Sequence, residues 1–267
     1  MSSTPRFVGV DGSPDGWVAV EYSEARYIGA TLYSDFVELW AEYDNDDTTI
    51  LVDVPIGLRE TTNDKRPCDD AARKVLGNPR SRSVFPPPIR AAAHATEYEA
   101  AKEIQEENTD GSLGTQAFAI CEKIAEVDDF LRENKSLAGT SIREAHPEVC
   151  FWALAGDAMS YSKTGQPAAA FWERVNVLQR IDSELLTHAQ DAANEIIDTV
   201  STTPTFKNDD LLDAFALALT ASNLTGGLRK LPDDAPETVS RAVFEELPDE
   251  QADPEGLPME MVYANPN

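Results

Sequence analysis

The sequence predicts an α/β protein in which a mixed β-sheet is flanked by helices. Three short β-prone runs follow one another at the start of the chain, and a helical stretch and an aliphatic strand come next. Most of the remaining sequence has a helical pattern, including one helix that is apolar on almost every side, as in a helix buried against other elements. The order β-β-β-α-β predicts a sheet with both antiparallel and parallel strand pairs.

The first half of the chain supplies the first four strands. Three are expected at residues 6–10, 17–22 and 26–33, with the turn DGSPDG between the first two. The stretch SDFVELWAEY predicts a helix capped by Ser34 or Asp35. The following run, TTILVDVPIG, is typical of a strand buried on both faces.

The rest of the chain is mainly helical. Helices are expected near residues 68–76, 95–107 and 113–133, and a Pro-rich stretch, SVFPPPIR, interrupts them. A short strand, SIREAHP, precedes EVCFWALAG, and further helices are expected over 168–200 and in NDDLLDAFALALTASN. The segment LPMEMVYA predicts an edge strand. We expect a single domain over 1–267 that contains a helical insertion at 59–138 and an acidic, Pro-rich loop at 226–258.

The composition is strongly acidic. There are 48 acidic and 22 basic residues, a net charge of −26, and the acidic residues are spread along the chain. Such a composition is typical of a halophilic protein, because multimolar salt shortens the Debye length to roughly 3 Å and screens self-repulsion. Three cysteines without CxxC spacing favour a reducing cytoplasm. No run of 18 apolar residues occurs, so we expect a soluble cytoplasmic protein with no membrane partner.

The apolar helix near residues 208–223 carries acidic side chains that need an explanation. Asp213 is the only charged residue between Leu211 and Leu219. One interpretation is a capping box in which Asp210 caps the helix and Asp213 reaches back. The other is that Asp210 and Asp213, three residues apart on one helix face, bind a cation together.

Two more aspartates end aliphatic strands. Asp11 follows FVGV and Asp53 follows ILV, and each is followed closely by Gly or Pro. Taken singly, each is a common turn residue. Taken together, they lie at the carboxyl ends of strands, where open α/β sheets bind ligands. Carboxylates that converge in a core need cations, and oxygen-only ligands favour Mg²⁺ or Mn²⁺. Two such ions about 4 Å apart would form a phosphoryl-transfer site.

At the level of whole motifs, the chain resembles a known family. The opening strand FVGVDGS and the helix DLLDAFALALTA are similar to elements of the RuvC-type Holliday-junction resolvases, which have a ribonuclease H-like fold. From about Phe7 to Tyr263 the chain resembles the predicted ribonuclease H-like nucleases of domain of unknown function 429, here as a haloarchaeal-type member. The matching motifs are GVDG…GWV, VDVPIGL, RPCDDAARKVLG, RSRSVFPPPIR, REAHPEVCFWALAG, DDLLDAFALALTA and GLPMEMVY.

The resemblance implies a metal-dependent nuclease that hydrolyses phosphodiester bonds in DNA or RNA with Mg²⁺ or Mn²⁺. It places Asp11, Asp53, Asp210 and Asp213 at the metal and catalytic positions. The fourth strand carries Asp53 where resolvases commonly have Glu, which shortens the reach of this ligand by one methylene. Glu148 is either a further metal ligand or a helix-start carboxylate stabilised by the helix dipole.

The one basic stretch of the chain lies between Lys65 and Arg90. Arginine is suited to bidentate phosphate contacts, and Phe85 could stack on a base. The alternative is that these arginines pair with acidic neighbours. The expected substrate-binding residues are Arg66, Arg73, Arg80, Arg82 and Arg90.

Two other functions remain open. An actin-like kinase also begins with a strand that ends in Asp-Gly, although such kinases usually have two lobes of this fold. A non-catalytic nucleic-acid-binding protein with the same fold is the other alternative. The sequence contains no GxxxxGK[ST], GxGxxG or GxSxG, which argues against P-loop, dinucleotide-binding and hydrolase sites.

Overall fold

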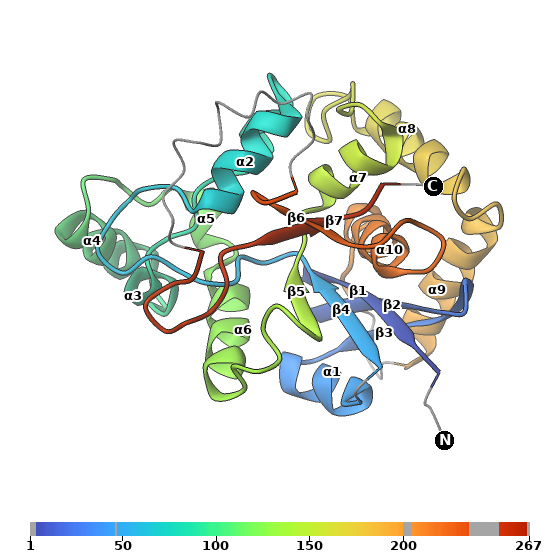
Figure 1. The fold of residues 1–267 in the computed structure, drawn as a ribbon, viewed down its shortest axis with the longest axis horizontal. Coiled ribbons are helices and arrows are strands. Elements are labelled where there is room, and N and C mark those ends of the chain that lie inside the picture. The colour runs from blue at the N-terminus through green and yellow to red at the C-terminus, as the bar shows by residue number, and fades with distance from the viewer. Residues whose placement is uncertain (1–3, 46, 200–203, 235–250, 266–267) are drawn as a thin grey trace. The chain divides into compact units, whose positions relative to one another are not determined.

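The structure, a computed structural model, describes residues 4–45, 47–199, 204–234 and 251–265 (Figure 1). Contacts divide the chain into two compact units, each made of separate segments. Unit 1 comprises Met1–Asp53, Ser141–Arg229 and Val262–Asn267. Unit 2 comprises Val54–Thr140 and Lys230–Met261.

Unit 1 contains a five-stranded mixed sheet of order β3-β2-β1-β4-β5. Its strands are β1 (Arg6–Ser13), β2 (Gly16–Ser23), β3 (Arg26–Tyr33), β4 (Thr48–Val52) and β5 (Ile142–Glu144). The first three strands pair antiparallel, and β4 lies parallel to both β1 and β5. An α/β fold with a mixed sheet is therefore confirmed, and all five strands lie where the sequence predicts strands.

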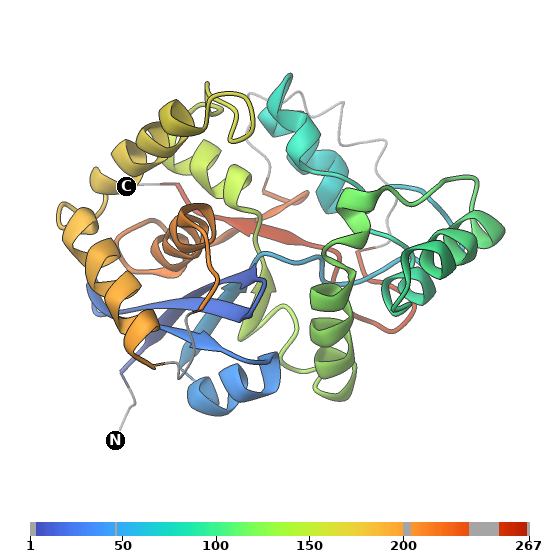
Figure 2. The ribbon, with the colours of Figure 1, turned by 180° about the vertical axis from the view of Figure 1, so that it is seen from behind.

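Five helices belong to unit 1 in the described ranges. They are α1 (Phe36–Tyr43), α7 (Pro147–Ala155), α8 (Pro167–Gln179), α9 (Leu185–Thr199) and α10 (Asn208–Ala221). Figures 1 and 2 show α10 on one face of the sheet and α1 on the other. The apolar helix predicted from the sequence is α10, whose residues from Leu211 to Ala221 are all buried.

Strand β2, which lies between β3 and β1, is buried along its whole length because both faces of the sheet are covered. Side chains alternate along a strand, so Val18 and Val20 point to one face and Trp17 to the other. Val18 and Val20 belong to the apolar cluster that includes Phe215 of α10. Trp17 packs edge-on against Phe36 of α1, with 5.5 Å between ring centroids.

Gly9 allows α10 to lie directly on β1. A Cβ atom built on Gly9 would lie 2.1 Å from the Ala214 carbonyl oxygen and 2.2 Å from the Ala218 nitrogen. Both contacts are with helix backbone, which has no side chain to turn aside. Any residue larger than glycine would therefore push β1 and α10 apart.

Unit 2 is built mainly from short helices. They are α2 (Pro67–Leu76), η1 (Arg80–Ser83), α3 (Arg90–Ala93), α4 (Tyr98–Asn108), α5 (Thr115–Phe118) and α6 (Cys121–Glu133). The helix expected at 113–133 is divided into α5 and α6, and α3 was not expected. Strands β6 (Arg229–Leu231) and β7 (Met261–Tyr263) form a two-stranded sheet. In the acidic, Pro-rich loop expected at 226–258, residues 235–250 lie outside the described part of the chain.

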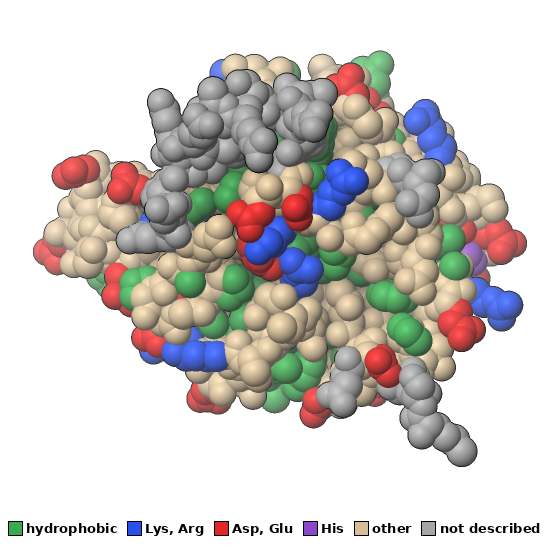
Figure 3. Space-filling view, viewed as in Figure 1, with side chains coloured by type: hydrophobic (Ala, Val, Ile, Leu, Met, Phe, Trp, Pro, Cys, Tyr) green, Lys and Arg blue, Asp and Glu red, His purple; other side chains and the backbone are tan. Residues whose placement is uncertain are grey.

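The surface view in Figure 3 shows Asp and Glu side chains spread around the visible face, with fewer Lys and Arg. Among the described residues, no helix has both the length and the apolar character needed to cross a membrane.

Candidate metal centre at the carboxyl edge of the sheet

Asp11 and Asp53 lie side by side at the carboxyl edge of the parallel strands. Val10 of β1 is in register with Val52, the last residue of β4. The Asp53 N–H then donates to the Val10 carbonyl oxygen at 3.0 Å, which continues the ladder by one residue. The next residue of β1 is Asp11, so the parallel register places the two aspartates beside each other.

Strand alternation directs Asp11 toward α10. Gly9 faces this helix, and Asp11, two residues further along β1, points to the same face of the sheet. Asp213 precedes Ala214, the residue whose backbone lies closest to Gly9. Asp11 and Asp213 are exposed by only 9% and 6%. The glycine contact therefore brings two buried carboxyl groups together from different elements.

The pKa values show that these carboxyl groups share one environment. Burial, followed by the charges of Asp53 and Asp213, raises the pKa of Asp11 well above its ordinary value. Burial raises the pKa of Asp53 to about 6, with His146 opposing and Asp213 adding to the shift. Burial also raises the pKa of Asp213, which nearby cations oppose. The metal-free cluster is therefore electrostatically unfavourable when fully ionised.

The nearest of these cations is Lys163, which the sequence analysis missed. It lies in the loop YSKTGQ between α7 and α8, and its Nζ donates to Asp213 Oδ2. Burial alone would lower the pKa of Lys163, but Asp213 raises it above its usual value. The loop has no periodic pattern that would indicate a role for Lys163. The scarcity of lysines in the chain is the one feature of the sequence that singles this residue out.

Asp210 has a structural role at the start of α10. Its Oδ2 accepts a hydrogen bond of 2.8 Å from the Lys207 N–H, so it closes the first turn of the helix. The capping box thus joins Lys207 and Asp210, and Asp213 takes no part in it. Asp210 still contributes to the field that raises the pKa of Asp11.

Glu148 lies at the start of α7 and forms a buried ion pair with Arg174. Glu148 Oε2 accepts from Arg174 Nη2 at 2.6 Å, and the two side chains are exposed by 6% and 1%. His146 caps α7, because its Nδ1 accepts from the Glu148 N–H at 3.1 Å. These contacts give Glu148 and His146 structural roles, and Arg174 also lowers the pKa of Asp213.

The donor set fits a divalent cation. Asp11, Asp53 and Asp213 act on one another as like charges, and Lys163 pairs with Asp213. Asp213 Oδ1 is buried and has no hydrogen-bond partner among the residues that the structure describes. An unpartnered buried carboxylate oxygen is costly, and a hard cation would satisfy it.

The aspartates are not packed as tightly as around a bound ion. Among the described side chains, three ligand atoms all within 4.8 Å of one another occur in unit 2 at His94, Asp128 and Asp129, and the aspartates of the candidate centre form no such set. Asp128 is already bound by the Arg90 guanidinium, which opposes a cation there. In the candidate centre, Lys163 forms an ion pair with Asp213.

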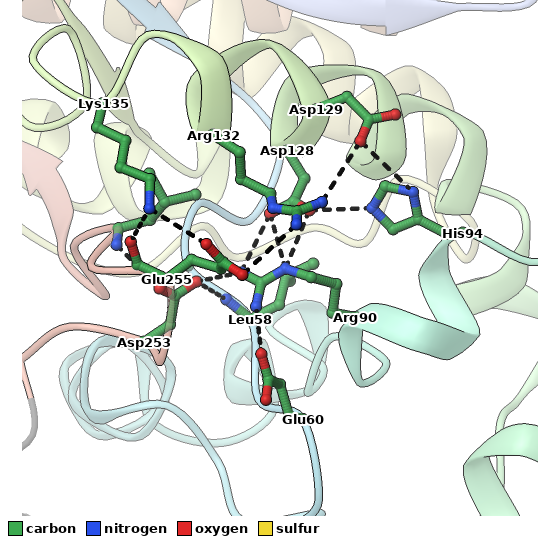
Figure 4. A network of polar contacts seen from close by, with 12 residues as sticks. Leu58, Glu60, Arg90, His94, Asp128, Asp129, Arg132, Lys135, Asp253 and Glu255 are labelled. Atoms are coloured by element: carbon green, nitrogen blue, oxygen red, sulfur yellow. Dashed lines mark hydrogen bonds and ion pairs between the residues drawn. The ribbon is translucent and has the colours of Figure 1, made fainter.

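Two of the five arginines expected to bind substrate are buried and paired with acidic side chains. Arg66 is 1% exposed and pairs with Asp69 at 2.6 Å. Arg90 is 7% exposed and binds Asp128 and Asp253 (Figure 4). Arg66 and Arg90 hold unit 2 together and cannot contact a phosphate without breaking these pairs.

The other three arginines are less buried. Arg73 Nη1 donates to the Ser81 carbonyl at 2.9 Å and to the Val84 carbonyl, so it fixes the turn that follows α2. Arg80 is partly buried, and Arg82 is exposed. Arg82 is therefore the best placed of the five to contact a ligand.

The fold and the site define an α/β protein with an acidic centre at the carboxyl edge of a five-stranded mixed sheet. The family model described as "Protein of unknown function (DUF429)" matches residues 9–237, which is most of the chain. The chain belongs to this family. Comparison with the curated proteins and with the solved structures finds no match.

Proposed function

We propose that the protein is a metal-dependent nuclease with a ribonuclease H-like sheet. The observation that carries this proposal is the convergence of Asp11, Asp53 and Asp213, with one oxygen of Asp213 buried and without a hydrogen-bond partner in the described part of the chain. The strand order, with an antiparallel β1–β2–β3 meander and β4 and β5 added in parallel, supports the fold assignment. Mg²⁺ or Mn²⁺ is the expected cofactor, because all the available ligands are oxygens.

When bound, the divalent cations would activate water and neutralise charge on a phosphodiester. Asp11 and Asp213 would hold them between β1 and α10, with Asp53 completing the site from β4. Burial raises the pKa of Asp53 to about 6 when no cation neutralises it, so cation binding would be coupled to release of a proton from Asp53 near this pH. Lys163 would exchange its contact with Asp213 for one with a phosphate oxygen.

Cleavage assays on purified protein test this proposal. Single-stranded DNA, duplex DNA, RNA and a DNA junction would be incubated with Mn²⁺ or Mg²⁺ in molar KCl, which suits the acidic composition. We expect cleavage by the wild type and none by Asp11→Asn or Asp213→Asn. Asp209→Asn is the matched control, because Asp209 is on the first turn of α10 and should leave activity intact.

The same preparations separate a nuclease from a kinase. A kinase of this fold would bind ATP with Mg²⁺ and leave oligonucleotides uncut. If ATP binds tightly and no substrate in the panel is cleaved under conditions where the protein is folded, the nuclease proposal is wrong. Cleavage that survives in both Asp11→Asn and Asp213→Asn would also overturn it, because the activity would then come from elsewhere.

A further inference from the structure

Unit 2 contains a pocket whose lining differs from the rest of this acidic protein. The pocket has a volume of about 220 Å³ and is lined by Phe85, Pro86–Pro88 and the amides Asn63, Gln105 and Gln116, among others. Of the described residues that line it, none is charged. Two larger hollows in the same unit, of about 550 and 350 Å³, are lined largely by acidic and other polar side chains.

The wall of the pocket is rigid and presents ring surfaces. Three consecutive prolines fix their own backbone angles and supply no N–H groups. Phe85 precedes them and is 37% exposed. In the described part of unit 2, no other large apolar side chain is exposed to this degree. An aromatic ring held at the mouth of a neutral pocket is suited to stacking on a planar ligand.

The polar side of the pocket is held in place by hydrogen bonds. Gln105 is 2% exposed, and its Oε1 accepts from the Ile89 N–H at 3.0 Å. Its Nε2 donates to Asn63 Oδ1 at 3.2 Å, which orients the exposed Asn63 amide. The Gln116 side chain is exposed at the same pocket. Amides with fixed positions can recognise the donors and acceptors on the edge of a base.

A cation lies close to the ring in the sequence. Arg82 is exposed in η1, three residues before Phe85. Arg73 bonds the Ser81 and Val84 carbonyls and so fixes the turn that carries both Arg82 and Phe85. The turn thus carries an aromatic ring and an exposed guanidinium, and the pocket adds neutral amides. These groups match the parts of one nucleotide: base face, phosphate and base edge.

We propose that this pocket binds an unpaired nucleobase of a single-stranded nucleic acid. The base would stack on Phe85, and Arg82 would contact the adjoining phosphate. The choice of a nucleic acid as the class of ligand rests on the proposed nuclease function. A protein of net charge −26 repels phosphates as a whole. Contact with an uncharged base avoids this repulsion.

The test measures binding by the full chain in EDTA, so that no cleavage occurs. A short labelled single strand is titrated by fluorescence anisotropy and compared with an otherwise identical strand that contains only abasic sugars. The variants are Phe85→Ala, Phe85→Trp and Arg82→Ala. Trp172→Ala is the matched control, because Trp172 is a 54% exposed aromatic residue of unit 1. Thermal unfolding of each variant confirms that it is folded.

We expect Phe85→Ala to weaken binding of the normal strand by about tenfold to a hundredfold. It should leave binding of the abasic strand unchanged, and Phe85→Trp should retain binding of the normal strand. Arg82→Ala should weaken binding of both strands. Equal binding of the two strands by the wild type would overturn the inference, as would equal losses in Phe85→Ala and Trp172→Ala. If the wild type binds a labelled Pro-rich peptide but no strand, the pocket is assigned to a peptide, and this result would also overturn the inference.

The outcomes distinguish this inference from the nuclease proposal. Cleavage that depends on Asp11, together with equal binding of normal and abasic strands, would remove only the pocket assignment. Base-dependent binding that depends on Phe85, with no cleavage under any metal, would remove only the nuclease assignment.

Discussion

Replacing Lys163 by methionine should tighten the binding of Mn²⁺. In the metal-free protein the Lys163 ammonium occupies Asp213 Oδ2, so a cation that uses this oxygen must first displace it. A hydrogen bond to a charged group contributes about 1.5–3 kcal/mol. Since about 1.4 kcal/mol corresponds to a factor of ten, the affinity for Mn²⁺ should rise about tenfold to a hundredfold. Methionine retains most of the apolar length of the side chain.

The same variant should be less stable without metal. Asp213 would then be a 6% exposed carboxylate without its closest cation, so its pKa would rise further and metal-free unfolding would require less urea. A given excess of Mn²⁺ should stabilise the Lys163→Met protein more than the wild type, because the added stability grows with the logarithm of the ligand concentration divided by Kd.

Isothermal titration calorimetry with Mn²⁺ measures the change in affinity, and urea unfolding measures the change in stability. Lys163→Arg retains the charge and should bind Mn²⁺ about as weakly as the wild type. Lys207→Met is the matched control, since Lys207 is an exposed lysine at the start of α10. If Lys163→Met binds Mn²⁺ no more tightly than Lys207→Met does, Lys163 does not compete for the site and the reasoning fails.

Four further predictions concern the carboxylates and the packing around them. Asp11→Asn should raise the urea midpoint of the metal-free protein, because it removes one charge from a mutually repelling cluster; a lower midpoint would identify Asp11 as a structural turn residue. The pKa of Asp53 is raised in the folded state from 3.8 to about 6. Protonated Asp53 therefore stabilises the folded state by up to about 3 kcal/mol. This contribution is fully present below pH 3.8 and is lost as the pH rises through about 6. Urea unfolding in EDTA at several pH values should show this loss in the wild type and less of it in Asp53→Asn. Gly9→Ala should destabilise the protein by about 3 kcal/mol or more and weaken Mn²⁺ binding, because it separates β1 from α10; a variant with wild-type stability would contradict the packing argument. Arg66→Met should cost about 3–5 kcal/mol by leaving a buried carboxylate unpaired, whereas Arg82→Met should change the unfolding free energy by less than about 0.5 kcal/mol.

The sheet and the buried helix could be predicted because their signals are local. Strand β4 is a continuous aliphatic run, and α10 is apolar on every side, so both patterns indicate burial before any partner is known. The aspartates could be predicted because Asp11 and Asp53 directly follow or end such strands. The close approach of β1 and α10 depends on Gly9, which the sequence analysis had no means of pairing with Ala214.

The features that the sequence did not predict depend on tertiary contacts. Lys163 belongs to a loop without periodicity, and its role appears only when the loop folds against α10. Arg66 resembles a surface arginine in sequence, but its guanidinium is buried against Asp69 and the Ile56 carbonyl. A basic stretch therefore indicates the presence of arginines, and only the fold decides which of them remain available to a ligand.

The way in which unit 2 is assembled affects synthesis of the protein on the ribosome. Asp253 accepts hydrogen bonds from the Leu58 and Leu257 N–H groups and forms an ion pair with Arg90. Arg90 and Asp253 are 163 residues apart in the chain. At about 5–20 residues per second, the ribosome needs about 8–30 s to make the second residue after the first. During this interval the emerging segment 54–140 lacks one acceptor of Arg90 and the acceptor of the Leu58 N–H, so unit 2 can complete its folding only after Asp253 has been made.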